Sequence, residues 1–255
     1  MKAIKIIALN TFREIIRDRI LYSLVIFAAL LIGLSLALGQ LSFSEQGRIS
    51  ANFGFTAIHL SAITLAVFIG STLVSREIEK RTIFSLLVRP ISREDFLFGK
   101  FFGLILIIFL LISGLSLILA FVLHQMDLPW TQQHFVAVLG IFLESVVMLS
   151  VVYLFGSFVT PLLTVVFSIG IFLIAHWVND LEFFSTVSRS KMFKAVASAT
   201  ATILPNFERF NWRSPPVTGD IIPINEVFSA TIYAACWTGV LLGVTILIFN
   251  KKDFS

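Results

Sequence analysis

Long uncharged runs alternate with short polar segments along most of this chain. Asp, Glu, Lys and Arg are absent from residues 49–75 and again from residues 101–126. A helix needs about 20 apolar residues to cross a hydrocarbon core about 30 Å thick. Each run is long enough, so the pattern predicts two membrane-spanning helices joined by the charged segment 76–100.

The same criterion predicts six spans in an all-α protein that forms a single transmembrane domain. Residues 135–177 carry only Glu144 as a charge. As one helix they would extend about 65 Å, twice the hydrocarbon thickness. The chain must therefore turn back, and Gly156 and Pro161 mark the turn. The predicted spans are 20–38, 56–74, 101–123, 136–156, 162–178 and 228–249.

Between the spans the sequence predicts a polar loop through Arg48 and a turn at Asp127–Trp130. Ser92 follows a proline and has the residue type of a helix N-cap, so a helix is predicted from Arg93 into the third span. The long mixed segment 179–226 contains an amphipathic piece at 191–201.

Residues 1–19 predict an amphipathic interfacial helix. One face at helical spacing is apolar, and Lys and Arg line most of the other face, as in a helix that lies in the plane of the lipid headgroups. The apolar face consists of Ile4, Ile7, Ala8, Phe12, Ile15 and Ile16. The alternative is that this helix extends the first span into water.

Composition supports a polytopic membrane protein. The 255 residues are 57% hydrophobic and 13% charged, whereas soluble domains carry about 25% charged residues. The net charge of +4 indicates membrane orientation and lipid contact, with no nucleic acid as a partner. Cys236 is the only cysteine, which excludes an internal disulfide and a thiol metal cluster. The basic, apolar start is interpreted as an uncleaved anchor.

The distribution of Lys and Arg predicts the orientation. Residues 1–19 hold five, residues 76–100 hold six and the C-terminus holds two, whereas the intervening loops hold Arg48 alone, none in 124–134 and five across 179–226. The positive-inside rule then places both termini and the 76–100 segment in the cytoplasm and 179–226 outside. The tryptophans Trp130, Trp177 and Trp212 fall near the expected outer aromatic belt. If the turn at 156–161 did not reach the inner surface, 179–226 would be cytoplasmic instead.

No catalytic or energy-coupling motif occurs in the sequence. It lacks a G-x-x-x-x-G-K-[ST] phosphate loop, a H-E-x-x-H pair and a G-x-S-x-G turn. Intramembrane acids and bases do not form a series that would relay protons. If this protein moves a solute uphill, another chain must supply the energy.

The order of residues in the 76–100 segment is specific. Two acids are followed by a threonine, a Leu-Leu pair, a proline, Ser-Arg and Gly-Lys. This order resembles the segment between the second and third spans of type-2 ABC exporter permeases (the type V ABC exporter fold), in particular those of the nitrous oxide reductase copper-assembly and gliding-motility systems. The elements Leu204–Phe207 and Lys252–Phe254 agree with the resemblance. Arg81 departs from it, since many relatives have glycine there.

The resemblance implies a coupling helix that docks on a cytoplasmic ABC ATPase subunit. The residues it implies for this contact are Glu77, Glu79, Arg81, Thr82, Phe84, Leu86, Leu87, Pro90 and Arg93. It also implies a second permease chain, identical or homologous, and an inner (plasma) membrane location. ATP and Mg²⁺ would be bound by the ATPase, with no cofactor on this chain. Membrane lipids and a periplasmic protein are further expected partners. The alternative for the segment is a solvated loop that only fixes topology.

Glu144 is the one carboxyl group inside a predicted span. A charge near the bilayer centre costs about 2.5–3.5 kcal/mol, so Glu144 should face protein or water. It is either a residue of the substrate path or a structural acceptor for Tyr153 or nearby hydroxyls. His59, His124 and His176 lie near the outer ends of spans and are interpreted as ordinary interfacial histidines, not metal ligands. Gly103 and the G-x-x-x-G at 239–243 suggest close helix packing.

Two other functions remain open from the sequence. One is a membrane enzyme that uses Glu144 and the outer histidines as acid and base. The other is a membrane scaffold without transport activity. No residue identifies the cargo, and the choice between export and transmission of force to outer partners stays open.

Overall fold

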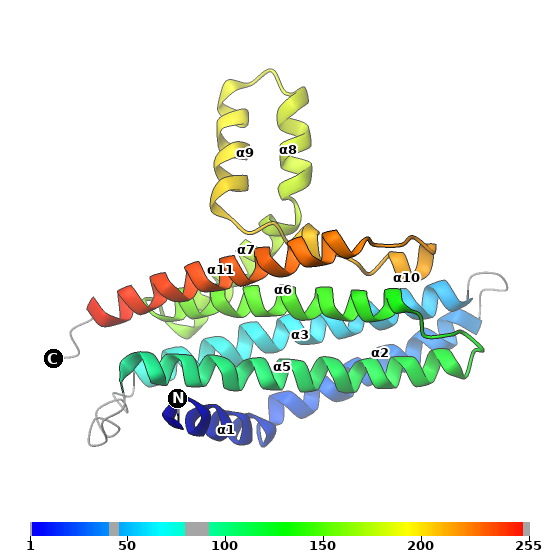
Figure 1. Cartoon of the computed structure of the whole chain (residues 1–255), viewed down its shortest axis with the longest axis horizontal. Coiled ribbons are helices and arrows are strands. Elements are labelled where there is room, and N and C mark those ends of the chain that lie inside the picture. The colour runs from blue at the N-terminus through cyan, green and yellow to red at the C-terminus, as the bar shows by residue number, and fades with distance from the viewer. Residues whose placement is uncertain (1, 41–45, 80–91, 252–255) are drawn as a thin grey trace.

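The computed structural model describes residues 2–40, 46–79 and 92–251, and within these ranges all regular structure is helical (Figure 1). Five long helices run side by side and form a bundle. The elements are α1 (Lys2–Ile16), α2 (Arg19–Gln40), α3 (Gln46–Glu79), α5 (Arg93–His124), α6 (Gln132–Gly156), α7 (Pro161–His176), α8 (Val178–Val187), α9 (Lys191–Ile203), the 3₁₀ turn η1 (Phe207–Phe210), α10 (Pro215–Thr218) and α11 (Ile224–Lys251).

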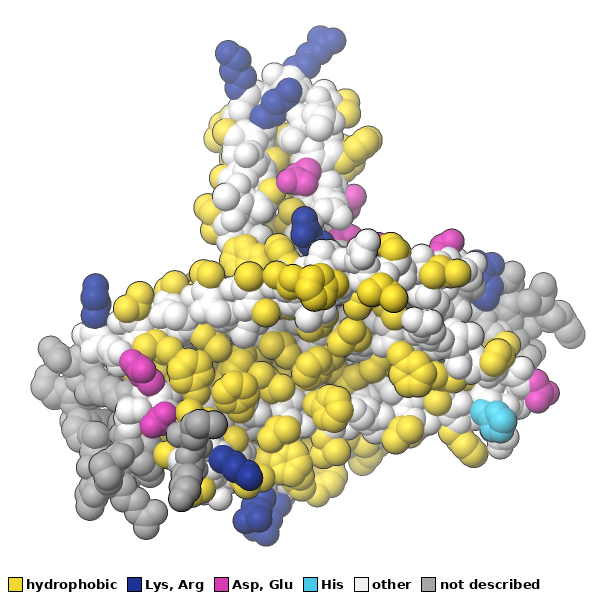
Figure 2. All heavy atoms as spheres, in the orientation of Figure 1, with side chains coloured by type: hydrophobic (Ala, Val, Ile, Leu, Met, Phe, Trp, Pro, Cys, Tyr) yellow, Lys and Arg dark blue, Asp and Glu magenta, His cyan; other side chains and the backbone are white. Residues whose placement is uncertain are grey.

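The surface of the bundle is apolar along its length. Hydrophobic side chains cover the visible flank, and charged side chains gather at the two ends and on the projecting hairpin (Figure 2). Large apolar side chains such as Leu117, Phe121 and Leu162 are exposed. An exposed apolar band of this extent suits contact with lipid tails, as the composition predicts.

Four described helices, α3, α5, α6 and α11, are long and apolar enough to cross a membrane, or five if α7 and α8 form one bent span. In α2 the apolar stretch Arg19–Ser35 is shorter than this criterion requires. A helical membrane protein is therefore confirmed, and six spans stay a prediction. The second predicted span, 56–74, lies inside the longer helix α3, so residues 46–48 are helical where the sequence suggested a loop.

The predicted helix starts and turns agree well with the structure. α5 begins at Arg93, and the Ser92 hydroxyl accepts a hydrogen bond of 3.1 Å from the Asp95 backbone N–H. α6 ends at Gly156 and α7 starts at Pro161. Proline suits the first turn of a helix because the N–H it lacks would have no intrahelical partner.

The fifth predicted span, 162–178, overlaps α7, which ends at His176. α7 has 16 residues, about 24 Å of helix, and the chain then bends by 52° into α8. Polar residues, among them Asp180 and Glu182, begin directly after this bend.

The segment 179–226 contains a helical hairpin and a compact turn. α8 and α9 pack together and project from the side of the bundle, across the direction of the long helices (Figure 1). α9 confirms the amphipathic piece predicted at 191–201. The rest of the segment folds back onto the bundle through η1.

The apolar face of α1 packs against the start of α5. Ala8 and Ile15 are buried, as the predicted face requires. Gly99 and Gly103 allow the two helices to approach closely, because a Cβ on Gly103 would lie 2.8 Å from the Ala8 carbonyl oxygen. α1 is thus attached to the bundle by its apolar side. The first turn of α1, the ends of α3 and α11 and the start of α5 lie toward one end of the molecule (Figure 1).

The buried side chains form two clusters. The larger one joins α1, α2, α3, α5 and α6 around residues such as Phe55, Phe101 and Tyr153. The smaller one joins α3, α6, α7, η1 and α11, with Phe207, Phe210 and Trp212 at its centre. Trp212 is buried, which corrects its predicted place in an outer aromatic belt, whereas Trp177 is exposed. The polar site described next lies beside this smaller cluster.

Candidate functional site: a buried His–Glu–His cluster

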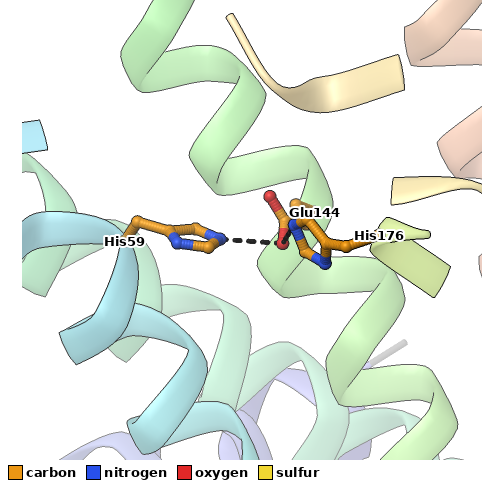
Figure 3. Close-up of side chains that lie close together, drawn as sticks. All are labelled: His59, Glu144 and His176. Carbon is orange, nitrogen blue, oxygen red and sulfur yellow. Dashed lines mark hydrogen bonds and ion pairs between the residues drawn. The ribbon is translucent and has the colours of Figure 1, made fainter. Parts of the chain in front are cut away.

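Glu144 lies in the middle of α6, a helix packed against α3, α7 and α11. Glu144 is only 1% exposed. The mostly apolar helix around it keeps it among the neighbouring helices. A buried carboxylate requires partners, because an unpaired buried charge is strongly unfavourable. Two histidines from other helices lie against it, and one of them is within hydrogen-bond distance (Figure 3).

His59 of α3 is the first partner. Its Nε2 atom lies 2.8 Å from Oε1 of Glu144, and its Nδ1 atom lies 2.8 Å from Nη1 of Arg213. A guanidinium carries only donors, so His59 Nδ1 must accept and His59 Nε2–H must donate to the carboxylate. Arg213, His59 and Glu144 therefore form one hydrogen-bonded series that joins a cation to an anion through a neutral ring.

His176, the last residue of α7, is the second partner. Its Nδ1 atom lies 3.0 Å from the Phe172 carbonyl oxygen, an acceptor, so Nδ1 carries the proton and donates. Its Nε2 atom lies 3.3 Å from Oε1 of Glu144 but makes no hydrogen bond and is buried. In its neutral form this ring directs the Nε2 electron pair at a carboxylate oxygen of Glu144, which lies beside it (Figure 3).

Arg213 reaches the site from the turn that follows η1. Asn206 caps η1, which precedes this turn: its Oδ1 accepts from the Glu208 N–H at 3.1 Å, and its backbone N–H donates to the Tyr233 hydroxyl at 2.8 Å. Arg213 Nε donates to Asn211 Oδ1 at 2.8 Å. The Leu204–Phe207 element noted in the sequence therefore positions the cation that faces His59.

These contacts change the interpretation of two residue types. Glu144 was expected to be either a residue of the substrate path or an acceptor for Tyr153 or nearby hydroxyls. The contact with Tyr153 is not formed, since its buried hydroxyl has no hydrogen-bond partner among the residues that the structure describes. His59 and His176 were expected to be interfacial, yet their side chains are only 4% and 18% exposed and both meet Glu144. His124 is exposed as expected.

Sequence reasoning missed Arg213 and the convergence of the two histidines. His59 and Glu144 are 85 positions apart, and His59 and Arg213 are 154 positions apart. The available signal was weak: a single acid in one span, and histidines in two others at similar predicted depth. A similar depth in the membrane predicts that these side chains meet only if their helices are neighbours, and the sequence does not give the order of the helices.

Most of the coupling segment lies outside the described residues. This applies to Arg81, Thr82, Phe84, Leu86, Leu87 and Pro90. Glu77 and Glu79 lie in the last turn of α3, and Arg93 is the first residue of α5. The segment is therefore flanked by two long helices that continue directly into the bundle.

A bundle of long apolar helices with a charge network enclosed among them defines a polytopic integral membrane protein. Residues 15–179 match the family described as ABC-2 family transporter protein. Because this match spans more than half of the 255 residues, the chain belongs to that family and is a membrane permease component of an ABC transporter. The match covers His59, Glu144 and His176, whereas Arg213 lies beyond it. No curated protein matches the sequence significantly.

Proposed function

We propose that this chain is the permease subunit of an ABC exporter in the inner (plasma) membrane. Two permease chains, identical or homologous, would act with two cytoplasmic subunits that bind ATP and Mg²⁺. The family match over residues 15–179 carries this proposal. The resemblance to the copper-assembly and gliding-motility permeases remains a prediction, and so do the cargo and the contact with a periplasmic protein.

Six spans are proposed from α2, α3, α5, α6, α7 and α11, with α7 (Pro161–His176) as the predicted fifth span, 162–178. An even number of spans agrees with the first turn of α1 and the end of α11, which lie toward the same end of the bundle (Figure 1). The Lys and Arg distribution supports a cytoplasmic location for that end. In this arrangement the hairpin of α8 and α9 belongs to the extracytoplasmic side.

Coupling to the ATPase is proposed to act through the 76–100 segment. α3 is a single helix of 34 residues, about 51 Å long, and it carries both the acids Glu77 and Glu79 and the buried His59. A movement of the segment would therefore be transmitted along α3 to the interior of the bundle. The capped start of α5 provides a second firm connection.

Co-purification with the ATPase subunit tests the proposal. Glu77→Lys and Leu87→Asp should each abolish retention of the ATPase while leaving membrane insertion and thermal stability unchanged. Asp127→Lys is the matched control, because Asp127 is an exposed acid at the opposite end of α5, and it should retain the ATPase. If both coupling variants retain the ATPase as the parent does, the docking assignment is wrong.

Distance measurements separate a transporter from a scaffold. In a Cys236→Ser background, spin labels on α3 and α5 of the assembled complex should change separation between the nucleotide-free and ATP-trapped states. An unchanged distance distribution in an ATPase-bound complex would favour a scaffold over a transporter.

A further inference from the structure

We propose that His59, Glu144 and His176 form a binding site for one divalent first-row transition-metal ion. Each residue offers one ligand atom, and the three atoms lie within 4.8 Å of one another. They come from three helices, α3, α6 and α7, so an ion here would link three parts of the bundle. The proposal goes beyond the function above and does not depend on it.

The unpartnered Nε2 atom of His176 is the strongest support. In the neutral ring its lone pair faces Glu144 Oε1 at 3.3 Å, and two acceptors at this distance repel unless a proton or a metal ion lies between them. The ring is held in this orientation because Nδ1–H donates to the Phe172 carbonyl oxygen at 3.0 Å. Histidines that bind metals commonly donate their other N–H to a backbone carbonyl in this way.

The separation between His176 and Glu144 suits a small cation with short bonds. Bonds of about 2.0–2.1 Å in a tetrahedral arrangement separate two ligand atoms by about 3.3–3.4 Å. The observed separation of 3.3 Å between His176 Nε2 and Glu144 Oε1 already has this value. The separation of 2.8 Å between His59 Nε2 and Glu144 Oε1 is that of a hydrogen bond and must open by about 0.5 Å to admit the ion.

The donor set selects the class of ion. Two imidazoles and one carboxylate suit Zn²⁺ and neighbouring divalent transition metals, whereas Ca²⁺ and Mg²⁺ prefer oxygen ligands throughout. Three protein ligands leave a fourth position for water or for a group of a bound molecule. These three residues therefore suit a metal site with one open position and not a structural site with four protein ligands.

Arg213 competes with the ion for His59. In the observed arrangement Arg213 Nη1–H donates to His59 Nδ1, which keeps the proton on Nε2 and the Nε2 lone pair unavailable. Metal binding requires the other neutral tautomer, with the proton on Nδ1 and the lone pair on Nε2. Arg213 must then move away from His59. Its second contact, in which Nε donates to Asn211 Oδ1 at 2.8 Å, would hold it in the turn that follows η1. Metal binding would thus break the contact between His59 of α3 and Arg213 of this turn, and it would join α3, α6 and α7 through the ion.

Zinc binding by the purified permease in detergent tests the site. After chelator treatment the parent should bind one equivalent of Zn²⁺, measured by competition with a chromophoric chelator and by elemental analysis. His176→Gln and Glu144→Gln should each weaken binding at least about tenfold. His124→Gln is the matched control, since His124 is exposed on α5, and it should bind as the parent does. Thermal unfolding of each variant checks that it is folded.

Arg213→Gln distinguishes a metal site from a purely structural network. Removal of the competing cation should tighten Zn²⁺ binding, by about tenfold or more, although the same change removes a hydrogen bond. A structural network predicts no gain. Co²⁺ bound to the parent should show the visible absorption of a site with nitrogen and oxygen ligands, and His176→Gln should lose it.

Two results would overturn the proposal. One is a parent that binds no more Zn²⁺ than folded His176→Gln does. The other is an Arg213→Gln variant that is folded and binds no more tightly than the parent. Neither measurement involves the ATPase. A failure to bind zinc would therefore not contradict the proposed permease function, and a loss of ATPase binding would not contradict the metal site.

Discussion

The backbone of Gly140 in α6 lies directly against the carbonyl group of Phe210 in η1. A Cβ atom at Gly140 would fall on the Phe210 carbonyl oxygen and would lie 3.0 Å from the Trp212 ring. Glycine is therefore required for η1 to rest on α6. This contact sets the position of the turn from which Arg213 reaches His59.

Gly140→Leu should displace η1 and separate Arg213 from His59. We expect a loss of stability of about 1–3 kcal/mol, as for overpacking of a buried site, measured by thermal unfolding in detergent. Tryptophan emission should shift to longer wavelength, because Trp212 is buried only while η1 is in place. Gly114→Leu is the control, since nothing lies within 4 Å of a Cβ there. A variant as stable as this control would contradict the packing described.

Removal of the Glu144 side chain should be far more harmful than its neutralisation. Glu144→Ala leaves Arg213 and His59 without their anion and should lower stability by about 3–5 kcal/mol. Glu144→Gln keeps an oxygen that accepts from His59 Nε2–H and should lose about 1–3 kcal/mol. The exposed Glu182 provides the comparison, and Glu182→Ala should stay within about 0.5 kcal/mol. Equal effects of the alanine and glutamine changes would show that the charge is not paired as observed.

The contact between α1 and α5 can be opened at one position. Gly103→Leu should push α1 away, because even a Cβ would lie 2.8 Å from the Ala8 carbonyl oxygen and from Thr11. A cysteine at Thr11, buried in the parent, should then become reactive to a water-soluble maleimide in a Cys236→Ser background. Gly33→Leu should leave it protected, since a Cβ there meets nothing within 4 Å. Protection in both variants would rule out this packing.

The orientation of the bundle gives opposite labelling at the two ends of α5. Ser92 and Asp127 are both exposed and lie on either side of the helix Arg93–His124. In intact cells an impermeant maleimide should label Asp127→Cys and should reach Ser92→Cys only after the membrane is made permeable. The reverse pattern would invert the proposed topology and remove the 76–100 segment from the reach of a cytoplasmic ATPase.

Several elements could be predicted because their causes are local. Ser92 caps the next helix through its own hydroxyl, Pro161 starts α7 because it lacks an N–H, and the apolar face of α1 follows from residue spacing. The 52° bend at Trp177 could not be predicted, since no proline or glycine marks it. The extension of α3 back to Gln46 was also missed, because polar residues there were taken to mean a loop.

The candidate site, too, could be predicted from the sequence only in part. A lone acid in an apolar helix already requires a protein partner, so the sequence identified Glu144 as unusual. It did not identify the partner, because any of several hydroxyls or histidines could meet the requirement. The order of the helices placed His59 and His176 beside Glu144. The close approach of η1 at Gly140 brought Arg213 to the second nitrogen of His59.

By itself the amino-acid sequence determined that this protein is helical, lies in a membrane and carries a charged segment between two spans. Those properties depend on the transfer of side chains between water and lipid, which each residue contributes almost independently of the others. Only the tertiary structure decided which polar groups meet inside the bundle. Such meetings depend on the rotation and order of helices that lie tens of residues apart, and these are fixed by the packing of many side chains at once.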